Sequence, residues 1–331
     1  GGQILPPVMG AAAFLMAEYL RLPYREIVIA AVIPALLYFY SVYLQISVLA
    51  EKHNLGAGEQ EPPKPYAVIA RHAVVVVVPM LTLLVGLFAF DVSAEEAVVW
   101  ASVALIVIGL FNIGGPHRVT PGEMIGAVYK AGRDSAEILL ICAVAGMIIG
   151  LMSSSGLSFG LSFVLLELGK DSLLLLLILT AVVSIILGMG LPTTGVYLLL
   201  ATLAAPPLVQ LGIGQLEAHF FVFYFGLLSM ISPPVALAAF AAASMAGSKP
   251  MPTAMECVRF GWIAFILPFA FVYHPGLLMQ GSAFQVIEAV GFALIAVPLV
   301  TAAMLGDGVR RIGPVERLVA GGLGVMCILP T

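Results

Sequence analysis

Long apolar runs, several of them interrupted by prolines, are the feature that most constrains what this chain can form. Each run has the length of a helix, and about 20 apolar residues suffice to cross a bilayer core. The residues are 61% hydrophobic and only 10% charged, whereas about 25% are charged in an average soluble domain. The sequence therefore predicts an all-α polytopic membrane protein.

Hydropathy predicts uninterrupted spans at about 26–50, 73–90, 96–113, 136–152, 258–280 and 285–306. The polar stretch 51–72 is typical of a linker. Residues 115–134 are expected to form a loop and a short amphipathic helix at the membrane interface, and 157–169 a second short interfacial helix. The sequence begins at Gly1 and ends in GVMCILPT, both inside hydrophobic segments, so we expect a fragment of a longer protein.

Two apolar segments contain a proline pair, PPV, followed by an alanine-rich stretch. The pairs are Pro6–Pro7 and Pro233–Pro234. Proline lacks an N–H and clashes with the preceding turn, so two in a row are expected to unwind a helix. Residues 8–20 then form a half-helix, since about 13 residues cannot cross a core of about 30 Å. Residues 216–247 are expected to form a second broken helix. The alternative is that each pair only kinks a packed helix.

Residues 172–212 form a third unusual segment, in which glycines and Pro192 interrupt one long apolar run. Two interpretations stay open: two ordinary spans joined by a tight turn, or a re-entrant hairpin whose tip stops near the midplane. Thr193 and Thr194 at the turn favour the hairpin, because irregular backbone at that depth must be buried in protein or face a wet cavity. The further pair Pro206–Pro207 is interpreted as structural.

The 14 Lys and Arg residues discriminate between topologies. If each proline-pair segment crosses once and 172–212 enters and leaves on one side, eleven of the 14 lie on one side and only Arg21, Arg25 and Lys170 on the other. This strong bias marks the first side as cytoplasmic. Two full crossings at 216–247 would give six against eight and remove the bias. The broken helices then cross in opposite senses, which predicts an inverted repeat, an arrangement common in secondary transporters.

Unwinding at the proline pairs also predicts where ligands bind. The carbonyls of Gly2 to Leu5 and of Ser229 to Ser232 lose helical donors, and an orphan carbonyl in lipid costs several kcal/mol. A sodium ion takes oxygen ligands, and half-helix N-termini attract a carboxylate. The expected sodium ligands are Gly2, Leu5, Gly188, Gly190, Thr194 and Ser232. The expected substrate contacts are Gln3, Pro7, Thr193, Thr194 and Pro234.

Other polar residues carry weaker predictions. Glu217 and His219 are interpreted as interfacial, with proton coupling as the alternative, and Ser153–Gly156 as a packing site or helix end, with a binding role as the alternative. Gln3 is either a ligand or a satisfied polar group. The sequence predicts no ionisable residue at the midplane and has no P-loop, which argues against an aspartate proton relay and ATP hydrolysis. The three cysteines lie far apart, so neither a disulfide nor a metal site is predicted.

Three stretches together resemble the large membrane subunit of TRAP (tripartite ATP-independent periplasmic) transporters, and the match runs in order over nearly the whole chain. They are GGQILPPVMGAAAFLMAEYLRLPYREI, GMGLPTTGVYLLLATLAAPPLVQLGI and EAHFFVFYFGLLSMISPPVALAAFAAASMAG. The nearest type is the fused permeases that work with TAXI-type binding proteins. Where the family often has a carboxylate before the two threonines this chain has Pro192, so no carboxylate ligand is expected there.

The resemblance implies an elevator mechanism in a bacterial or archaeal inner membrane. Sodium flows inward, a periplasmic TAXI-type protein delivers an organic anion, and a mobile transport domain carries the anion past a static scaffold. A small membrane subunit, fused or separate, is the other expected partner. Residues 1–20 and 135–249 are assigned to the transport domain, 21–113 and 250–331 to the scaffold, and 114–134 to a connector helix.

The expected function is therefore sodium-coupled import of carboxylates such as dicarboxylates, 2-oxoacids or glutamate. The alternative is a binding-protein-independent or proton-coupled secondary anion transporter of the wider ion-transporter group. A membrane enzyme or a channel component is disfavoured, because an enzyme would show His, Asp or Glu clustered at membrane depth and a channel does not need paired broken helices. Nucleic acid is not an expected partner.

Overall fold

The computed structural model describes residues 2–7, 9–52, 65–111, 120–170, 172–306 and 313–328, and every regular element in these ranges is a helix. The prediction of an all-α polytopic membrane protein is confirmed. Among the described residues, five helical segments are long and apolar enough to cross a membrane: Tyr24–Lys52, Pro121–Ser154, Thr193–Gln210, Pro250–Tyr273 and Ala283–Leu305.

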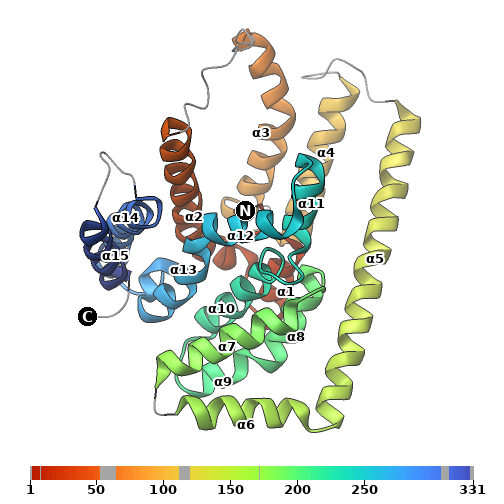
Figure 1. The fold of residues 1–331 in the computed structure, drawn as a ribbon. Coiled ribbons are helices and arrows are strands. Elements are labelled where there is room, and N and C mark those ends of the chain that lie inside the picture. Colours follow the sequence, from red (N-terminus) through yellow and green to blue (C-terminus); the bar gives the residue numbers. More distant parts are fainter. Residues whose placement is uncertain are drawn as a thin grey trace.

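The first helices follow the predicted order (Figure 1). Helix α1 (Ala11–Leu20) has 10 residues, about 15 Å of rise, and so is too short to cross alone. It is followed by α2 (Tyr24–Lys52) and by the antiparallel pair α3 (Tyr66–Phe88) and α4 (Ala94–Leu110). Most of the predicted linker, residues 53–64, lies outside the described residues.

Helix α5 (Pro121–Ser154) differs from the prediction of a connector helix at 115–134 followed by a separate span. It is one helix of 34 residues, about 51 Å long. Thr120 and Glu123 form a capping box at its start, with Pro121 in the first turn. No later proline stops the helix, and an interior glycine costs only about 1 kcal/mol. The helix therefore continues through the expected boundary between residues 134 and 135. Residues 112–119 lie outside the described residues.

The hairpin segment forms two helical arms with a turn between them. After α6 (Leu157–Gly169), which has the predicted limits, α7 (Leu173–Gly188) is the first arm. The chain turns at residues 189–192 and returns as α8 (Thr193–Leu203) and α9 (Ala205–Gln210). Pro206–Pro207 lies in the first turn of α9, where a missing N–H costs no helical hydrogen bond. This position fits the interpretation that the pair is structural. This geometry fits both interpretations of the segment.

The second proline-pair segment is broken as predicted, into α10 (Gln215–Leu228) and α11 (Leu237–Ala246). The span predicted at 258–280 has the wrong limits. The helices there are α12 (Pro250–Phe260) and α13 (Trp262–Tyr273), separated at Gly261. Pro275 then starts the 3-10 turn η1 (Pro275–Leu278), so the helix ends earlier than hydropathy suggests. The last helices are α14 (Ala283–Leu305) and α15 (Pro314–Ile328).

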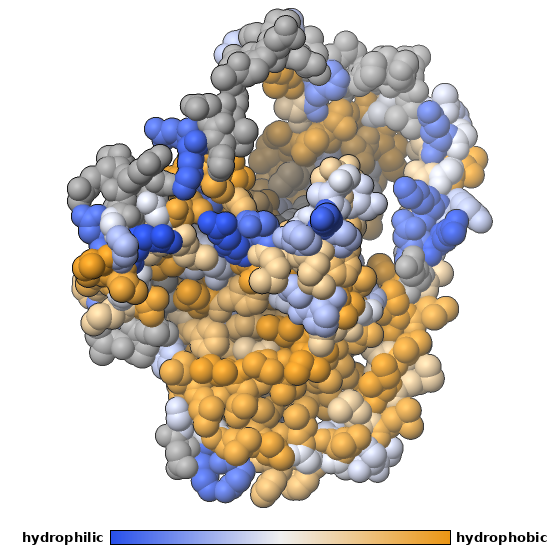
Figure 2. Space-filling view, viewed as in Figure 1, coloured by the Kyte–Doolittle hydropathy of each residue, from blue (hydrophilic) through white to orange (hydrophobic). Residues whose placement is uncertain are grey.

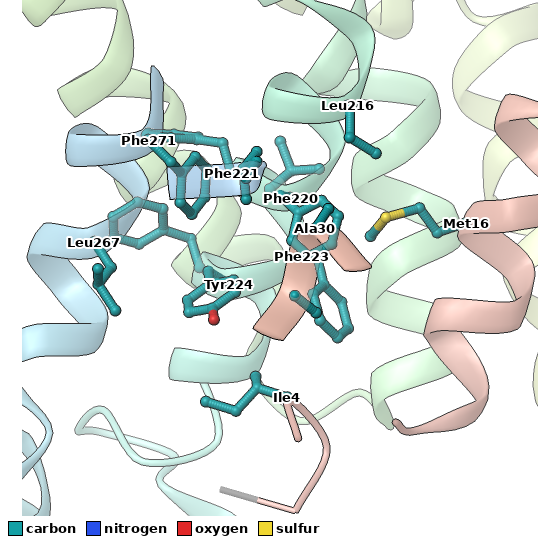
Figure 3. Close-up of a cluster of buried hydrophobic side chains, with 14 of the residues drawn as sticks. Ile4, Met16, Ala30, Leu216, Phe220, Phe221, Phe223, Tyr224, Leu267 and Phe271 are labelled. Carbon is teal, nitrogen blue, oxygen red and sulfur yellow. The ribbon is translucent and has the colours of Figure 1, made fainter. Parts of the chain in front are cut away.

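The core is centred on α10, because a helix that is hydrophobic all round is buried on all sides. Figure 3 shows Phe220, Phe221, Phe223 and Tyr224 of α10 packed against side chains from α1, α2 and α13, and all four are almost inaccessible. The outer surface is also apolar: hydrophobic side chains cover the lower half of the face in Figure 2. The first half of the second broken helix, α10, is thus enclosed by protein, whereas most of α11 is exposed.

Candidate functional site

The first break comprises residues 2–10, ahead of α1. Its turn is closed by a hydrogen bond of 3.3 Å from the Gly10 N–H to the Gln3 carbonyl. The buried Pro7 carbonyl accepts a hydrogen bond of 2.8 Å from the Tyr24 hydroxyl of α2. The Gln3 carbonyl, one of those freed by the prolines, and the Pro7 carbonyl therefore already have donors within the protein.

The second break comprises residues 229–236, between α10 and α11. The Ala238 N–H donates to the Met230 carbonyl at 3.0 Å and closes this turn. Two hydroxyls bond to carbonyls of α10 itself: Ser229 Oγ donates to Gly226 at 2.6 Å and Ser232 Oγ to Leu228 at 2.7 Å. This break is held by its own side chains.

The two breaks share one backbone design. In each, the carbonyl that accepts the closing bond belongs to the third residue before the first proline, Gln3 or Met230. Both Pro–Pro peptide bonds are cis. Each break is followed by a helix of 10 residues, α1 or α11. The short motif PPV thus marks two breaks with similar features, while the inverted repeat remains a prediction.

The half-helices also end alike. Each ends at a residue with left-handed backbone, Arg21 (φ 54°) or Gly247 (φ 63°). The next amide bonds to a carbonyl five residues back, from Leu22 to Ala17 at 3.0 Å and from Ser248 to Ala243 at 2.9 Å. This is the Schellman arrangement, which satisfies carbonyls at a helix end.

The hairpin tip packs directly on the second break. A Cβ at Gly188 would lie 2.7 Å from Ser229 Oγ, and a Cβ at Gly226 would lie 2.6 Å from Val196 Cγ1, so both positions admit only glycine without rearrangement. Gly190 adopts φ +80° at the turn and faces Val235. Glycine therefore allows α7, α8 and α10 to approach closely.

A cavity of about 320 Å³ lies between the two breaks. It is lined by Gly2, Gln3 and Ile4 from the first break, by Leu228, Met230, Ile231 and Ala238 around the second, and by Tyr38, Tyr224, Leu227 and Ala264. The Tyr224 hydroxyl is buried and has no hydrogen-bond partner among the described residues. Figure 3 shows this hydroxyl on the side of Tyr224 where Ile4 lies. A buried phenol usually has a hydrogen-bond partner, so Tyr224 is a candidate site residue that sequence reasoning missed.

The structure does not bring all the predicted site residues together. Gly2 and Gln3 line the cavity between the breaks, whereas Thr194 lines a separate cavity of about 510 Å³ together with Glu18 and Glu95. Thr193 is half-buried and Ser232 is buried. Leu5, Gly190 and Pro234 are exposed. The roles of these residues as ligands remain predictions.

His219 and Glu217 are both buried in protein, and their interfacial position remains a prediction. His219 Nδ1 shares a hydrogen bond of 2.8 Å with the Tyr197 hydroxyl of α8. Its ring also packs against Tyr19 of α1, with centroids 5.1 Å apart. The contacts between helices that bury this histidine are not visible in a local sequence pattern.

Comparison with known proteins identifies the family of the chain. Residues 1–286 match the family model of the DctM component of the tripartite ATP-independent periplasmic transporter. The C4-dicarboxylate TRAP transporter large permease protein DctM of Pseudomonas aeruginosa is 21% identical over 278 residues, which cover 83% of this chain and 63% of that protein. The chain thus spans less than two thirds of this relative's length. The family is one of permeases, so the expectation that the chain is not an enzyme is confirmed. The chain belongs to the DctM family of tripartite ATP-independent periplasmic transporters.

Proposed function

We propose that this chain is the permease part of a sodium-coupled importer of organic anions in a bacterial or archaeal inner membrane. A periplasmic binding protein of the TAXI type delivers the substrate, and a small membrane subunit completes the transporter. The family assignment supports this proposal, and the relative from Pseudomonas aeruginosa is named for C4-dicarboxylates. The substrate class is carboxylates, including dicarboxylates, 2-oxoacids and glutamate.

The observation that carries the proposal is the pair of matched breaks with a cavity between them. Helices α1 and α11 both begin at a break, so each directs the positive end of its dipole toward that break. A carboxylate is favoured at such helix N-termini, and unwound backbone supplies oxygens for a cation. The two breaks together therefore suit an anion and a sodium ion in one compartment.

Ser232 is the best supported of the proposed sodium ligands. Its hydroxyl proton is directed to the Leu228 carbonyl, so the lone pairs of Oγ are left to face a cation. Gly188 and Gly190 lie in the hairpin tip that packs on this break, and Thr194 supplies a hydroxyl on the other side of the tip. Gly2 and Leu5 offer the equivalent carbonyls at the first break.

The close packing of the hairpin supports an elevator mechanism. The contacts at Gly188 and Gly226 leave no space between the hairpin arms and α10. A closely packed interior has low compressibility, so the displacement of one helix is transmitted to the helices packed against it. The hairpin and the second broken helix therefore move as one body, as a mobile transport domain requires.

Uptake by proteoliposomes containing the complete transporter and its binding protein tests the sodium sites. We expect Thr193→Ala and Ser232→Ala to weaken sodium activation more than they lower protein abundance. Thr202→Ala is the matched control, because the Thr202 hydroxyl bonds to carbonyls within α8 at 3.0 and 2.9 Å. Sodium activation that is unchanged in both test variants contradicts the assignment. Uptake that persists without the binding protein contradicts that part of the proposal.

Proton coupling, or transport without a binding protein, is the second candidate, and the buried His219–Tyr197 pair favours the proton version. A neutral His219 accepts or donates at Nδ1, whereas a protonated one can only donate. Uptake driven by a pH gradient in sodium-free buffer, and lost in His219→Gln, would support this candidate. Uptake that needs sodium and is unaffected by the pH gradient would eliminate it.

A further inference from the structure

An apolar cavity of about 140 Å³ lies between α5 and the tip of the hairpin, apart from the cavity between the breaks. Five of its lining residues come from α5 and four from the hairpin, and all nine are apolar. Helix α5 approaches most closely at Gly195, where a Cβ would lie 3.3 Å from Ile141 Cγ2 and 3.9 Å from Ala145 Cβ. The cavity is thus built on the first turn of α8, directly after Thr193 and Thr194.

Water does not suit this cavity. A buried water typically makes about three hydrogen bonds, and here all nine lining residues are apolar. An engineered cavity of about 150 Å³ with a similar lining stays dry and binds benzene or xenon. An empty void is also unfavourable, because the lining atoms lose their dispersion contacts on one side. A hydrocarbon of similar size is the ligand that the lining fits.

The surroundings of the cavity identify the source of that hydrocarbon. Leu140 and Val144 line the cavity and are also 67% and 40% exposed, so the cavity opens on the outer flank of α5. Leu139, Met147 and Leu151 on the same helix are 70%, 61% and 70% exposed. In a membrane permease, such an apolar flank faces the bilayer core. The nearest hydrocarbon to the opening is therefore an acyl chain.

We propose that the end of a phospholipid acyl chain occupies this cavity and supports the hairpin tip from the side of α5. Pro192 and Gly195, which bracket the two threonines, both line the cavity. An inserted chain fills the space that would otherwise let the tip shift toward α5. The site is separate from the cavity between the breaks, and its ligand is a lipid instead of the transported anion.

Photo-crosslinking of the complete transporter in nanodiscs tests the proposal. The probe is a phosphatidylcholine with a diazirine near the end of one acyl chain, and mass spectrometry of peptides locates the adducts. We expect adducts on residues 191–199 of the hairpin as well as on the exposed flank of α5. Ala145→Phe fills the cavity, and we expect it to lower hairpin labelling about fivefold, the change that about 1 kcal/mol of binding free energy produces.

Met147→Phe is the matched control, because Met147 lies on the same helix but does not line the cavity. We expect it to leave hairpin labelling unchanged. Leu199→Ala enlarges the cavity and should raise hairpin labelling. Absence of adducts on the hairpin, or equal labelling in Ala145→Phe and Met147→Phe, would overturn the proposal and point to an empty cavity or a protein segment there. Neither result depends on transport activity.

Discussion

The two breaks share several backbone features but are stabilised in different ways. At the first, a tyrosine 17 residues away on α2 bonds to the Pro7 carbonyl. At the second, Ser229 and Ser232 bond to carbonyls three and four residues back in their own helix. The position of Ser232 is taken at the first break by the exposed Leu5. A repeated backbone geometry can therefore be supported either by a neighbouring helix or by local side chains.

Under the proposed function, this difference in chemistry assigns different roles to the two breaks. The second break carries hydroxyl oxygens and contacts the hairpin tip through Gly188. The first break offers backbone carbonyls and the Gln3 amide on the wall of the shared cavity. Substitutions that act on one break and spare the other test how far this comparison holds.

The largest effect is expected from Gly188→Ala, at the contact between the hairpin and the second break. The new Cβ would lie 2.7 Å from Ser229 Oγ and 3.1 Å from Val196 Cγ1. Ser229 cannot move freely, because it is bonded to the Gly226 carbonyl. We expect a loss of about 2 kcal/mol in the free energy of unfolding, the usual cost of overpacking. Chemical unfolding in detergent micelles measures it.

Gly10→Ala is the matched change at the first break. Its nearest neighbours would be atoms of the Gln3 side chain, at 3.3 Å and beyond, and that side chain can move aside. We expect a change within about 0.5 kcal/mol. Equal losses in the two glycine variants would show that the hairpin contact does not distinguish the breaks.

Tyr24→Phe should loosen the first break alone. It leaves the buried Pro7 carbonyl without the Tyr24 donor but keeps an aromatic ring to stack on Phe14, 4.2 Å away between centroids. We expect a loss of about 1 kcal/mol in the free energy of unfolding. The rate of thiol labelling should rise at Leu5→Cys and stay unchanged at Met230→Cys. Faster labelling at both positions would mean that the breaks are coupled.

A modest effect is expected from Ser229→Ala, because the hydroxyl bond that it removes joins residues three apart in the same helix. A loss of about 0.5 kcal/mol in the free energy of unfolding is expected. The same change removes the atom nearest to a Cβ at Gly188. The double variant with Gly188→Ala should therefore lose less than the sum of the single losses, by about 0.5 kcal/mol or more. If the losses in unfolding free energy were strictly additive, the Cβ added by Gly188→Ala and the Ser229 side chain would not be in steric conflict.

The sequence by itself determined the membrane class, the half-helices beside both proline pairs and the turn of the hairpin. These features depend on apolar composition and on the missing N–H and fixed backbone angle of proline, which act on immediate neighbours. The capping box that starts α5 at Pro121 is also a local feature. Hydropathy nevertheless predicted an interfacial segment followed by a separate span in this helix, because its first turns contain charged residues.

Only the tertiary structure decided which side chains share a cavity. Thr194 and Gln3 both lie beside irregular backbone in the sequence, but they line different cavities because α8 turns Thr194 toward α1, α4 and α5. The burial of His219 and the unpartnered hydroxyl of Tyr224 likewise depend on helices distant in the chain. Helix ends follow from local backbone chemistry, whereas a binding site follows from which helix faces meet, and that is set by packing across the whole molecule.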